Sequence, residues 1–277
     1  MTARRTVEAR KVTGDPLRAP KRGDLVVEEI KRWIVTRELK PGDKLPKEAE
    51  LQLLFSVSKG TIREALKSLD VQGFISVSTG PAGGATVVEV PFERTFQLVQ
   101  NYLFFKDVDV GDIYAVRRIL EPELAAGAVP HLTKRDFVAL EASIETCAPA
   151  AADVDQALKQ RQEDLHFHDI LAAANPNPFL RFSCQMINQM LRRLVVFGLS
   201  PMHAHYGEMG RTNVAAHRTL LDAARKRDVE KVRKLMLAHV IEAESYVKKM
   251  QGAVSSRLVL DSEMRVSVTP RHAGIRR

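Results

Sequence analysis

The chain has 277 residues, of which 45% are hydrophobic and 27% are charged. This length suits one large domain or two ordinary ones, and the apolar content excludes a chain that is disordered throughout. No apolar run approaches the roughly 18 to 20 residues that a bilayer-spanning helix needs. The two cysteines, Cys147 and Cys184, lie far apart in the sequence, as is common in the reducing cytoplasm. We therefore expect a cytoplasmic protein that does not enter the membrane.

The net charge of +8 comes from the two ends of the chain. Residues 1–22 carry a net charge of +5, residues 252–277 carry +3, and residues 23–251 are neutral. Both ends lack apolar periodicity and are predicted to be flexible basic arms, although residues 254–269 could form a short strand. Solvated arms explain the excess charge as well as a binding patch does, so nucleic-acid binding has to be argued from local patterns.

Residues 23–90 are predicted to form one compact unit. A first helix would be capped by Asp24 and carry on one face Leu25, Val26, Ile30, Trp33 and Ile34. After a turn at Pro41-Gly42, a second helix is expected over 47–55, with inward side chains at Leu51, Leu54 and Phe55.

A third helix is expected from the N-cap Ser58 to about residue 72, where Gly73 would serve as the C-cap. Two strands, 74–78 and 86–90, flank a glycine-rich turn over 79–85. The order of helix, helix, helix and hairpin describes a winged helix-turn-helix, an α/β fold whose third helix enters the major groove of DNA.

The third helix has two distinct faces. Ile62, Leu66 and Leu69 share an apolar face, and Lys59, Arg63 and Lys67 lie four residues apart on another. The basic face could be no more than the solvated side of an amphipathic helix. As a DNA-reading face it would use Arg63 for a guanine edge and the hydroxyls of Ser58 and Thr61 near the helix start.

Residues 91–251 show helical spacing without strand signals. The expected helices cover about 92–105, 109–129, 133–147, 152–173, 177–198, 206–226 and 228–251, with Asp228 as the cap of the last. The chain is therefore predicted to be a winged helix-turn-helix followed by an all-α helical-bundle effector domain.

Four side chains in this second part have a spacing that suits a metal site. Asp164 and His168 are four residues apart on one predicted helix, so they share a face. His217 and His239 lie about 10 and 12 residues from the turn between the last two helices, so antiparallel packing would bring them to one level. Three imidazoles and one carboxylate suit a divalent ion such as Zn or Ni. The alternative is a set of unrelated buried and surface histidines.

The segment 39–88 resembles the DNA-binding domain of the GntR family of bacterial transcription regulators. The resemblance lies in Pro41 to Pro46 (PGDKLP), Val57-Ser58, Thr61 to Leu66 (TIREAL), Leu69, Gly73 and the glycine-bearing wing. It implies DNA contacts by Ser58, Lys59, Gly60, Thr61 and Arg63 of the third helix and by Thr79 and Gly80 of the wing.

Two positions depart from the family pattern. Ala49 stands where an arginine commonly contacts DNA, and we expect Lys47 to compensate through a phosphate. Lys59 also replaces a common arginine, which exchanges a planar fork for a point charge. The operator is therefore expected to differ from the usual one.

Residues 110–245 resemble the FCD ligand-binding domain of the FadR-type branch of this family. The matching stretches are Arg117 to Glu123 (RRILEPE), Asp164 to His168 (DLHFH), Asn175, and 217–239 with a histidine at each end. The resemblance implies four metal ligands, namely Asp164, His168, His217 and His239. It also implies a small carboxylate effector at the metal, with Arg117 as the partner of its charge. Arg117 could instead form an i, i+4 salt bridge with Glu121.

These features predict a homodimeric transcription regulator, by default a repressor, that binds palindromic operator DNA and responds to a small organic acid. A metal-dependent hydrolase that uses the same four ligands is the main alternative. An architectural DNA-binding protein with a structural metal is the second, and it would bind its operator regardless of any small acid.

Overall fold

The computed structural model describes residues 21–80, 83–103, 106, 108–196 and 203–251. The centre of the wing turn, the possible strand at 254–269 and almost all of both predicted arms lie outside these ranges. The chain divides into two compact units between Leu98 and Val99. None of the helices in the described ranges is both long and apolar enough to cross a membrane.

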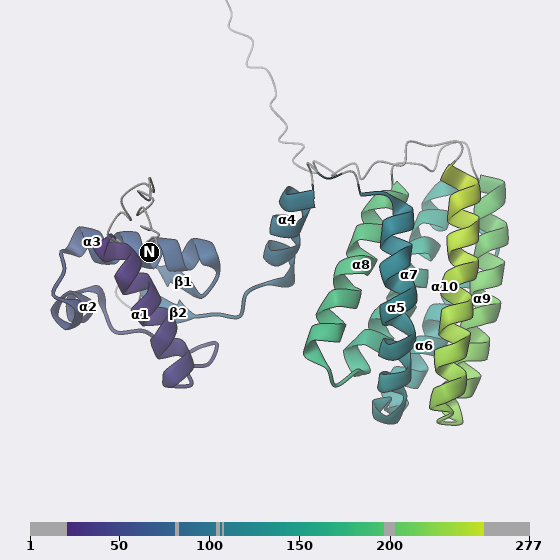
Figure 1. Cartoon of the computed structure of the whole chain (residues 1–277), viewed down its shortest axis with the longest axis horizontal. Helices are drawn as coiled ribbons and strands as arrows, with labels where there is room; N and C mark the ends of the chain where they lie inside the picture. The colour runs from purple at the N-terminus through teal and green to yellow at the C-terminus, as the bar shows by residue number, and fades with distance from the viewer. Residues whose placement is uncertain (1–20, 81–82, 104–105, 107, 197–202, 252–277) are drawn as a thin grey trace, which may run out of the picture. The chain divides into compact units, whose positions relative to one another are not determined.

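The first unit has the predicted order of three helices and a hairpin (Figure 1). Its elements are α1 (Arg22–Thr36), α2 (Glu48–Phe55), α3 (Lys59–Gln72), β1 (Ile75–Ser78) and β2 (Gly84–Val87). The strands pair antiparallel, with Ile75 opposite Val87 and Ser78 opposite Gly84. Lys44 adds an antiparallel bridge to Thr86 on the other edge of β2.

One apolar core joins all of these elements. Its centre is formed by fully buried side chains from the three helices and β1, which include Ile30, Leu51, Ile62, Leu69 and Ile75. The inward face predicted for the third helix is confirmed, because Ile62, Leu66 and Leu69 are all buried. This packing leaves the opposite face of α3 exposed to solvent.

The ends of α3 are also as predicted. The Ser58 side chain accepts a hydrogen bond from the Thr61 backbone N–H at 3.2 Å. At the other end Gly73 has φ +83°, in the left-handed region that favours glycine, and its backbone N–H bonds the Asp70 carbonyl. Helix α3 therefore has a fixed beginning and a fixed end.

Three details of the first two helices differ from the expectation. The N-cap of α1 is Lys21, so Asp24 lies in the first turn, where its charge still suits the helix dipole. Leu25 and Leu54 were both expected on inward faces, but they are 55% and 61% exposed, respectively. On α2 the i, i+4 pair Leu51 and Phe55 takes the inward face, and Leu54 is rotated from Phe55 by about 100°.

The second unit consists of long helices packed side by side (Figure 1). Helix α4 (Phe92–Leu103) spans the boundary between the two units in the sequence. The helices after it are α5 (Val110–Ala128), α6 (Lys134–Cys147), α7 (Val154–Ala174), α8 (Pro178–Val196), α9 (His203–Arg225) and α10 (Val229–Gln251), with a short 3-10 turn η1 (Val129–His131) after α5. Helix α5 packs against α10, α8 and α7, and α9 packs against α10, α6 and α7. All the expected helices are present, and only their ends shift by a few residues.

Side chains at the helix starts explain most of these boundaries. Asp109 and Asp112 bond each other's backbone N–H groups at the start of α5, and Thr133 and Asp136 do the same at α6. Asp228 caps α10 as predicted, since its carboxylate accepts a bond from the Lys231 N–H at 3.0 Å. The antiparallel pairing of α9 and α10 that this turn produces brings His217 and His239 together.

Candidate metal centre and nucleic-acid interface

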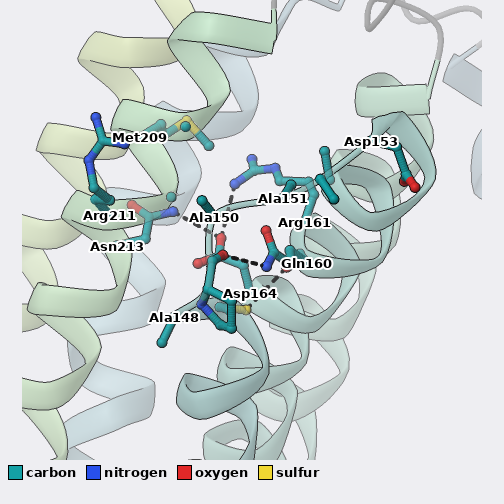
Figure 2. A pocket seen from close by; sticks show the side chains of 16 residues that line it. Ala148, Ala150, Ala151, Asp153, Gln160, Arg161, Asp164, Met209, Arg211 and Asn213 are labelled. Atoms are coloured by element: carbon teal, nitrogen blue, oxygen red, sulfur yellow. Dashed lines mark hydrogen bonds and ion pairs between the residues drawn. The ribbon is translucent and has the colours of Figure 1, made fainter.

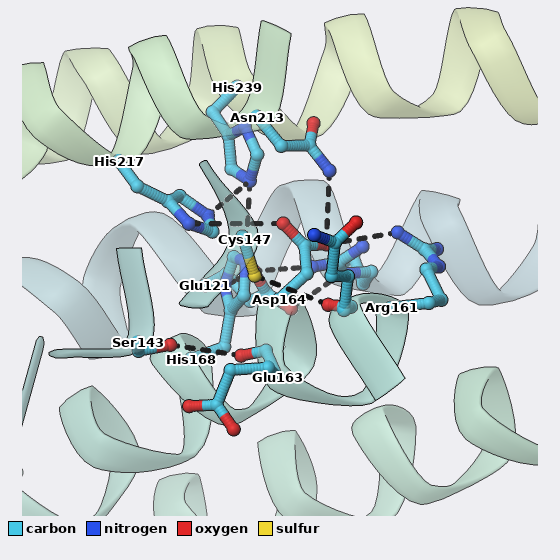
Figure 3. Close-up of polar contacts among 12 residues, drawn as sticks. Glu121, Ser143, Cys147, Arg161, Glu163, Asp164, His168, Asn213, His217 and His239 are labelled. Carbon is cyan, nitrogen blue, oxygen red and sulfur yellow. Dashed lines mark hydrogen bonds and ion pairs between the residues drawn. The ribbon is translucent and has the colours of Figure 1, made fainter. Parts of the chain in front are cut away.

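Three buried imidazoles meet inside the helical unit (Figure 3). His168 comes from α7, His217 from α9 and His239 from α10. The Nε2 atom of His239 lies 3.2 Å from that of His217 and 3.3 Å from that of His168. Each of the three side chains is at most 3% exposed. Ring nitrogens from three separate helices thus point at one place.

The spacing of these nitrogens fits a metal ion. With Zn–N bonds of about 2.0 to 2.1 Å, two ligands of a tetrahedral site lie about 3.3 to 3.4 Å apart. The two Nε2–Nε2 distances, 3.2 and 3.3 Å, match such an edge. The Nδ1 atom of His239 is buried and has no hydrogen-bond partner among the described residues. The donor set and its geometry therefore suit a divalent ion with an imidazole preference.

Burial favours the neutral, metal-binding form of two of the histidines, His217 and His239. It lowers the pKa of His217 well below its usual value, and the neighbouring His168 contributes in the same direction. Burial and the adjacent His217 likewise lower the pKa of His239. Phe167 stacks on the His217 ring at a centroid distance of 3.9 Å and fixes its plane. Neutral imidazoles in fixed orientations offer lone pairs to a cation.

Glu121 on α5 connects the cluster to Arg117. Its Oε2 lies 2.9 Å from Nδ1 of His168, and its two oxygens accept bonds from Nε and Nη2 of Arg117 at 2.6 and 3.1 Å. Although burial opposes ionisation, Arg117 and His168 hold the pKa of Glu121 well below its usual range. A carboxylate beside Nδ1 favours the tautomer that carries its proton there and leaves Nε2 free for a metal, although the 2.9 Å contact lacks hydrogen-bond geometry. The salt bridge considered as an alternative for Arg117 is thus present.

Asp164 lies beside the three histidines but is already bonded on its other side. Its Oδ1 is 3.9 Å from Nδ1 of His217. Its Oδ2 accepts bonds from Nη1 of Arg161 and from Nδ2 of Asn213, both at 3.0 Å. The structure therefore brings three of the four expected ligands into one group and places the fourth next to it.

The residues expected to contact DNA gather in the first unit. Ser58 precedes α3, Lys59, Gly60 and Thr61 form its first turn, and Arg63 and Lys67 follow on the exposed face. Thr79 and Gly80 are exposed at the end of β1, where Gly80 has φ +107°. Lys47 is exposed directly before α2. Apart from the half-buried Thr61, all of these residues are open to solvent.

Arg63 has a partner within the chain. Its Nε lies 3.1 and 3.3 Å from the two carboxylate oxygens of Glu48 on α2. The Arg63 side chain is 62% exposed, so the pair is open to solvent and worth little in stability. DNA that uses the Arg63 guanidinium has to compete with this carboxylate.

Four neighbours of the expected site residues were not identified from the sequence as parts of a site: Glu48, Glu121, Arg161 and Asn213. Arg161 precedes Asp164 by three residues, and Asn213 precedes His217 by four, so helical spacing could have found both. Glu121 was considered only as a partner of Arg117, and its contact with His168 depends on tertiary packing. The contact between Glu48 and Arg63 joins two helices and has no local signal.

Comparison with known proteins gives two family matches and a consistent set of relatives. Residues 23–87 match the model for bacterial regulatory proteins of the gntR family, and residues 112–242 match the FCD domain. The chain is 30% identical over 154 residues to the HTH-type transcriptional regulator LutR of Bacillus subtilis, which covers 56% of this chain and 68% of LutR. It is 24% identical over 228 residues to the HTH-type transcriptional repressor NanR of Salmonella newport, which covers 81% of this chain and 85% of NanR.

A solved structure agrees at the level of the fold. The Streptococcus agalactiae GntR structure aligns with a TM-score of 0.58 and 22% identity, over 80% of this chain and 99% of that one. The arrangement of a winged helix followed by a helical unit is therefore one that a known protein adopts.

Proposed function

Because the chain belongs to the GntR family of bacterial transcription regulators and carries an FCD domain, we propose that it is a repressor controlled by a small organic acid bound at a metal site. The matching families and relatives are transcription regulators and not enzymes, so the hydrolase alternative is excluded. The DNA-binding and regulatory role follows from the family. The metal, the effector and the sign of regulation are parts of the proposal.

The observation that carries the metal site is the convergence of three buried Nε2 atoms at distances that fit a tetrahedral edge. We assign His168, His217 and His239 as ligands, with Asp164 as the fourth, and Zn or Ni as the ion. A bound dication would attract a carboxylate to an open coordination position. Arg117 supports this centre mainly by fixing Glu121, which in turn orients His168.

DNA reading is assigned to the first unit, in a homodimer that binds a palindromic operator. Helix α3 would enter the major groove with Ser58, Lys59, Gly60, Thr61, Arg63 and Lys67, while Lys47, Thr79 and Gly80 contact the backbone beside it. Repression is supported by the likeness to NanR, which is named a repressor. We propose the domain limits 23–90 and 91–251 between two basic arms, and a cytoplasmic location.

We propose that the effector changes operator affinity by acting on the helical unit. Effector binding beside the metal would favour one of two arrangements of this unit. The resulting change in operator affinity is limited by how much more tightly the effector binds one arrangement than the other. The residues of this chain contribute the ligand set, the orientation of His168 by Glu121 and the exclusion of water by close packing. Removal of the metal should therefore remove the response to effector but not the ability to bind DNA.

Two single substitutions test the two halves of the proposal. Arg63→Ala should weaken operator binding by about 1–3 kcal/mol, as measured by fluorescence anisotropy, and leave zinc binding intact. His217→Ala should abolish the zinc-dependent rise in melting temperature and leave operator binding intact. The metal site is rejected if His217→Ala and the wild type respond to zinc identically. An operator affinity that no small acid alters in zinc-loaded protein would favour the architectural alternative.

A further inference from the structure

A cavity of about 440 Å³ opens beside Asp164 (Figure 2). Its walls come from the connection between α6 and α7, from one face of α7 and from the first half of α9. Most of the connection consists of small apolar residues, namely Ala148, Pro149, Ala150, Ala151 and Ala152. Asp164 lines this cavity, but none of the three histidines does. Asp164 therefore lies between the cavity and the cluster of imidazoles and adjoins both.

Arg161 is the buried cation of this cavity. Its side chain is 7% exposed, and its Nη1 donates to Oδ2 of Asp164 at 3.0 Å. Its Nε is buried without a hydrogen-bond partner among the described residues. Asn213, which bonds the same oxygen of Asp164, likewise has a buried Oδ1 with no partner there. An unmet buried polar atom costs about 1–3 kcal/mol. The Nε–H of Arg161 therefore favours an acceptor oxygen of a ligand, whereas Oδ1 of Asn213 itself needs a donor.

The balance of charge around the site points to the kind of acceptor. Arg117 with Glu121 and Arg161 with Asp164 are two neutral pairs, and metal-binding imidazoles are uncharged. A dication at the histidines would therefore leave the buried cluster with an excess of two positive charges. Excess charge in a water-poor interior is costly unless an anion accompanies it. A ligand with two negative charges restores neutrality.

We propose that this cavity binds a small organic dianion, one of whose carboxylates pairs with the guanidinium of Arg161. The inference rests on the proposed metal site, because the metal supplies the excess of two positive charges and attracts the other carboxylate. The alanine-rich wall and the buried Met209 accept the short carbon chain between the two carboxylates. The exposed guanidinium of Arg211 at the rim adds a positive charge along the way in. Arg161 thus determines that diacids are bound in preference to monoacids.

Isothermal titration of the zinc-loaded full chain tests this preference with matched pairs of acids. Malonate, succinate and glutarate each have a monoacid of equal chain length in propionate, butyrate and valerate. We expect at least one diacid to bind ten times more tightly than its monoacid. Arg161→Gln should reduce that ratio to less than twofold with an unchanged zinc stoichiometry. Arg218→Gln, which alters an exposed arginine on α9, should keep the ratio of the wild type.

The results that would contradict the proposal test its two parts, Arg161 and the metal site, separately. If no diacid is preferred by the wild type, or if the preference survives in Arg161→Gln, the role of Arg161 is overturned. Arg161→Lys guards against a loss of folding, because it keeps the charge and should retain part of the preference. A diacid preference that persists in zinc-free His217→Ala but disappears in Arg161→Gln supports the pairing with Arg161. That result would count against the proposed metal site instead.

Discussion

Glu121 contacts the guanidinium of Arg117 on one side and the imidazole of His168 on the other. Its ionised form is stabilised by Arg117, and its Oε2 faces Nδ1 of His168. The same carboxylate therefore keeps a guanidinium in a water-poor interior and sets the direction of a ligand lone pair. Loss of its charge should affect both the metal affinity and the stability of the fold.

Glu121→Gln should lower zinc affinity by about 10- to 100-fold, because His168 loses the charge that orients it. A competition titration with a chromophoric chelator measures this. Glu123→Gln is the matched control on the same helix, since Glu123 is exposed and pairs with Arg233. Urea unfolding of the metal-free protein should also show a loss of stability, because Arg117 stays buried without a full counter-charge. Equal zinc affinities of Glu121→Gln and wild type would refute the orienting role.

Glu48→Gln should raise DNA affinity a few-fold. Glu48 holds the Nε of Arg63 and therefore competes with DNA for the guanidinium. The gain should disappear in an Arg63→Ala background, which a double-mutant cycle by anisotropy would measure. Glu64→Gln changes the net charge equally at an exposed position of α3, next to Arg63. If Glu64→Gln gives the same gain within that cycle, simple charge removal explains the effect and the ion pair does not.

At the scale of helices, the first residue of α6 is fixed by a pair of reciprocal hydrogen bonds between side chains and backbone N–H groups. Helix α6 follows the N-cap Thr133, whose hydroxyl accepts from the Asp136 N–H. The Asp136 carboxylate in turn accepts from the Thr133 N–H and hydroxyl. These bonds lower the pKa of Asp136. A depressed pKa means that the carboxylate stabilises the fold above its unfolded pKa. This contribution is lost as the pH falls through the folded pKa.

Thr133→Ala should therefore cost about 1 kcal/mol in the free energy of unfolding at neutral pH. Asp136→Asn should also destabilise at neutral pH, and its difference from wild type should shrink in acid as the wild-type carboxylate becomes protonated. Urea unfolding at both pH values measures this. Asp155→Asn, in the first turn of α7 but outside a reciprocal pair, controls for the helix dipole alone. An Asp136→Asn deficit that stays constant with pH would refute the assignment.

Helical periodicity and cap residues were enough to predict which elements form, but not every face that they bury. Ser58, Gly73 and Asp228 act locally, so their roles could be read from neighbours along the chain. Leu54 was misassigned because a short apolar helix offers more apolar positions than its core can accept. The spacing of His217 and His239 from the turn after α9 was sufficient to predict that they lie at one level of the two helices.

The partners of the site could not be obtained in this way. The contact of Glu121 with His168 joins α5 to α7, and the sharing of Asp164 between Arg161 and Asn213 joins α7 to α9. Such contacts depend on how whole helices are rotated against each other. Periodicity gives the buried side of a helix but not the rotation to within one side chain.

At the scale of the whole molecule, the chain consists of two compact units with separate cores. Ile62 is fully buried in the first, and the three histidines lie in the second. A ligand stabilises only the structure that binds it, by an amount that grows with the logarithm of its concentration over Kd. The metal should therefore affect the two units unequally.

Thermal unfolding of the full chain should show two transitions, of which zinc raises only one. At about 100 times its Kd, zinc should stabilise the helical unit by about 2.7 kcal/mol. His217→Ala should remove this shift without moving the other transition. Ile62→Ala should lower the other transition, with a cost of about 2–5 kcal/mol, and leave the zinc-sensitive one in place. Differential scanning calorimetry with zinc and with chelator distinguishes these outcomes. A single transition that zinc and Ile62→Ala both move would mean that the two units unfold as one, so that metal binding also stabilises the unit that contains α3.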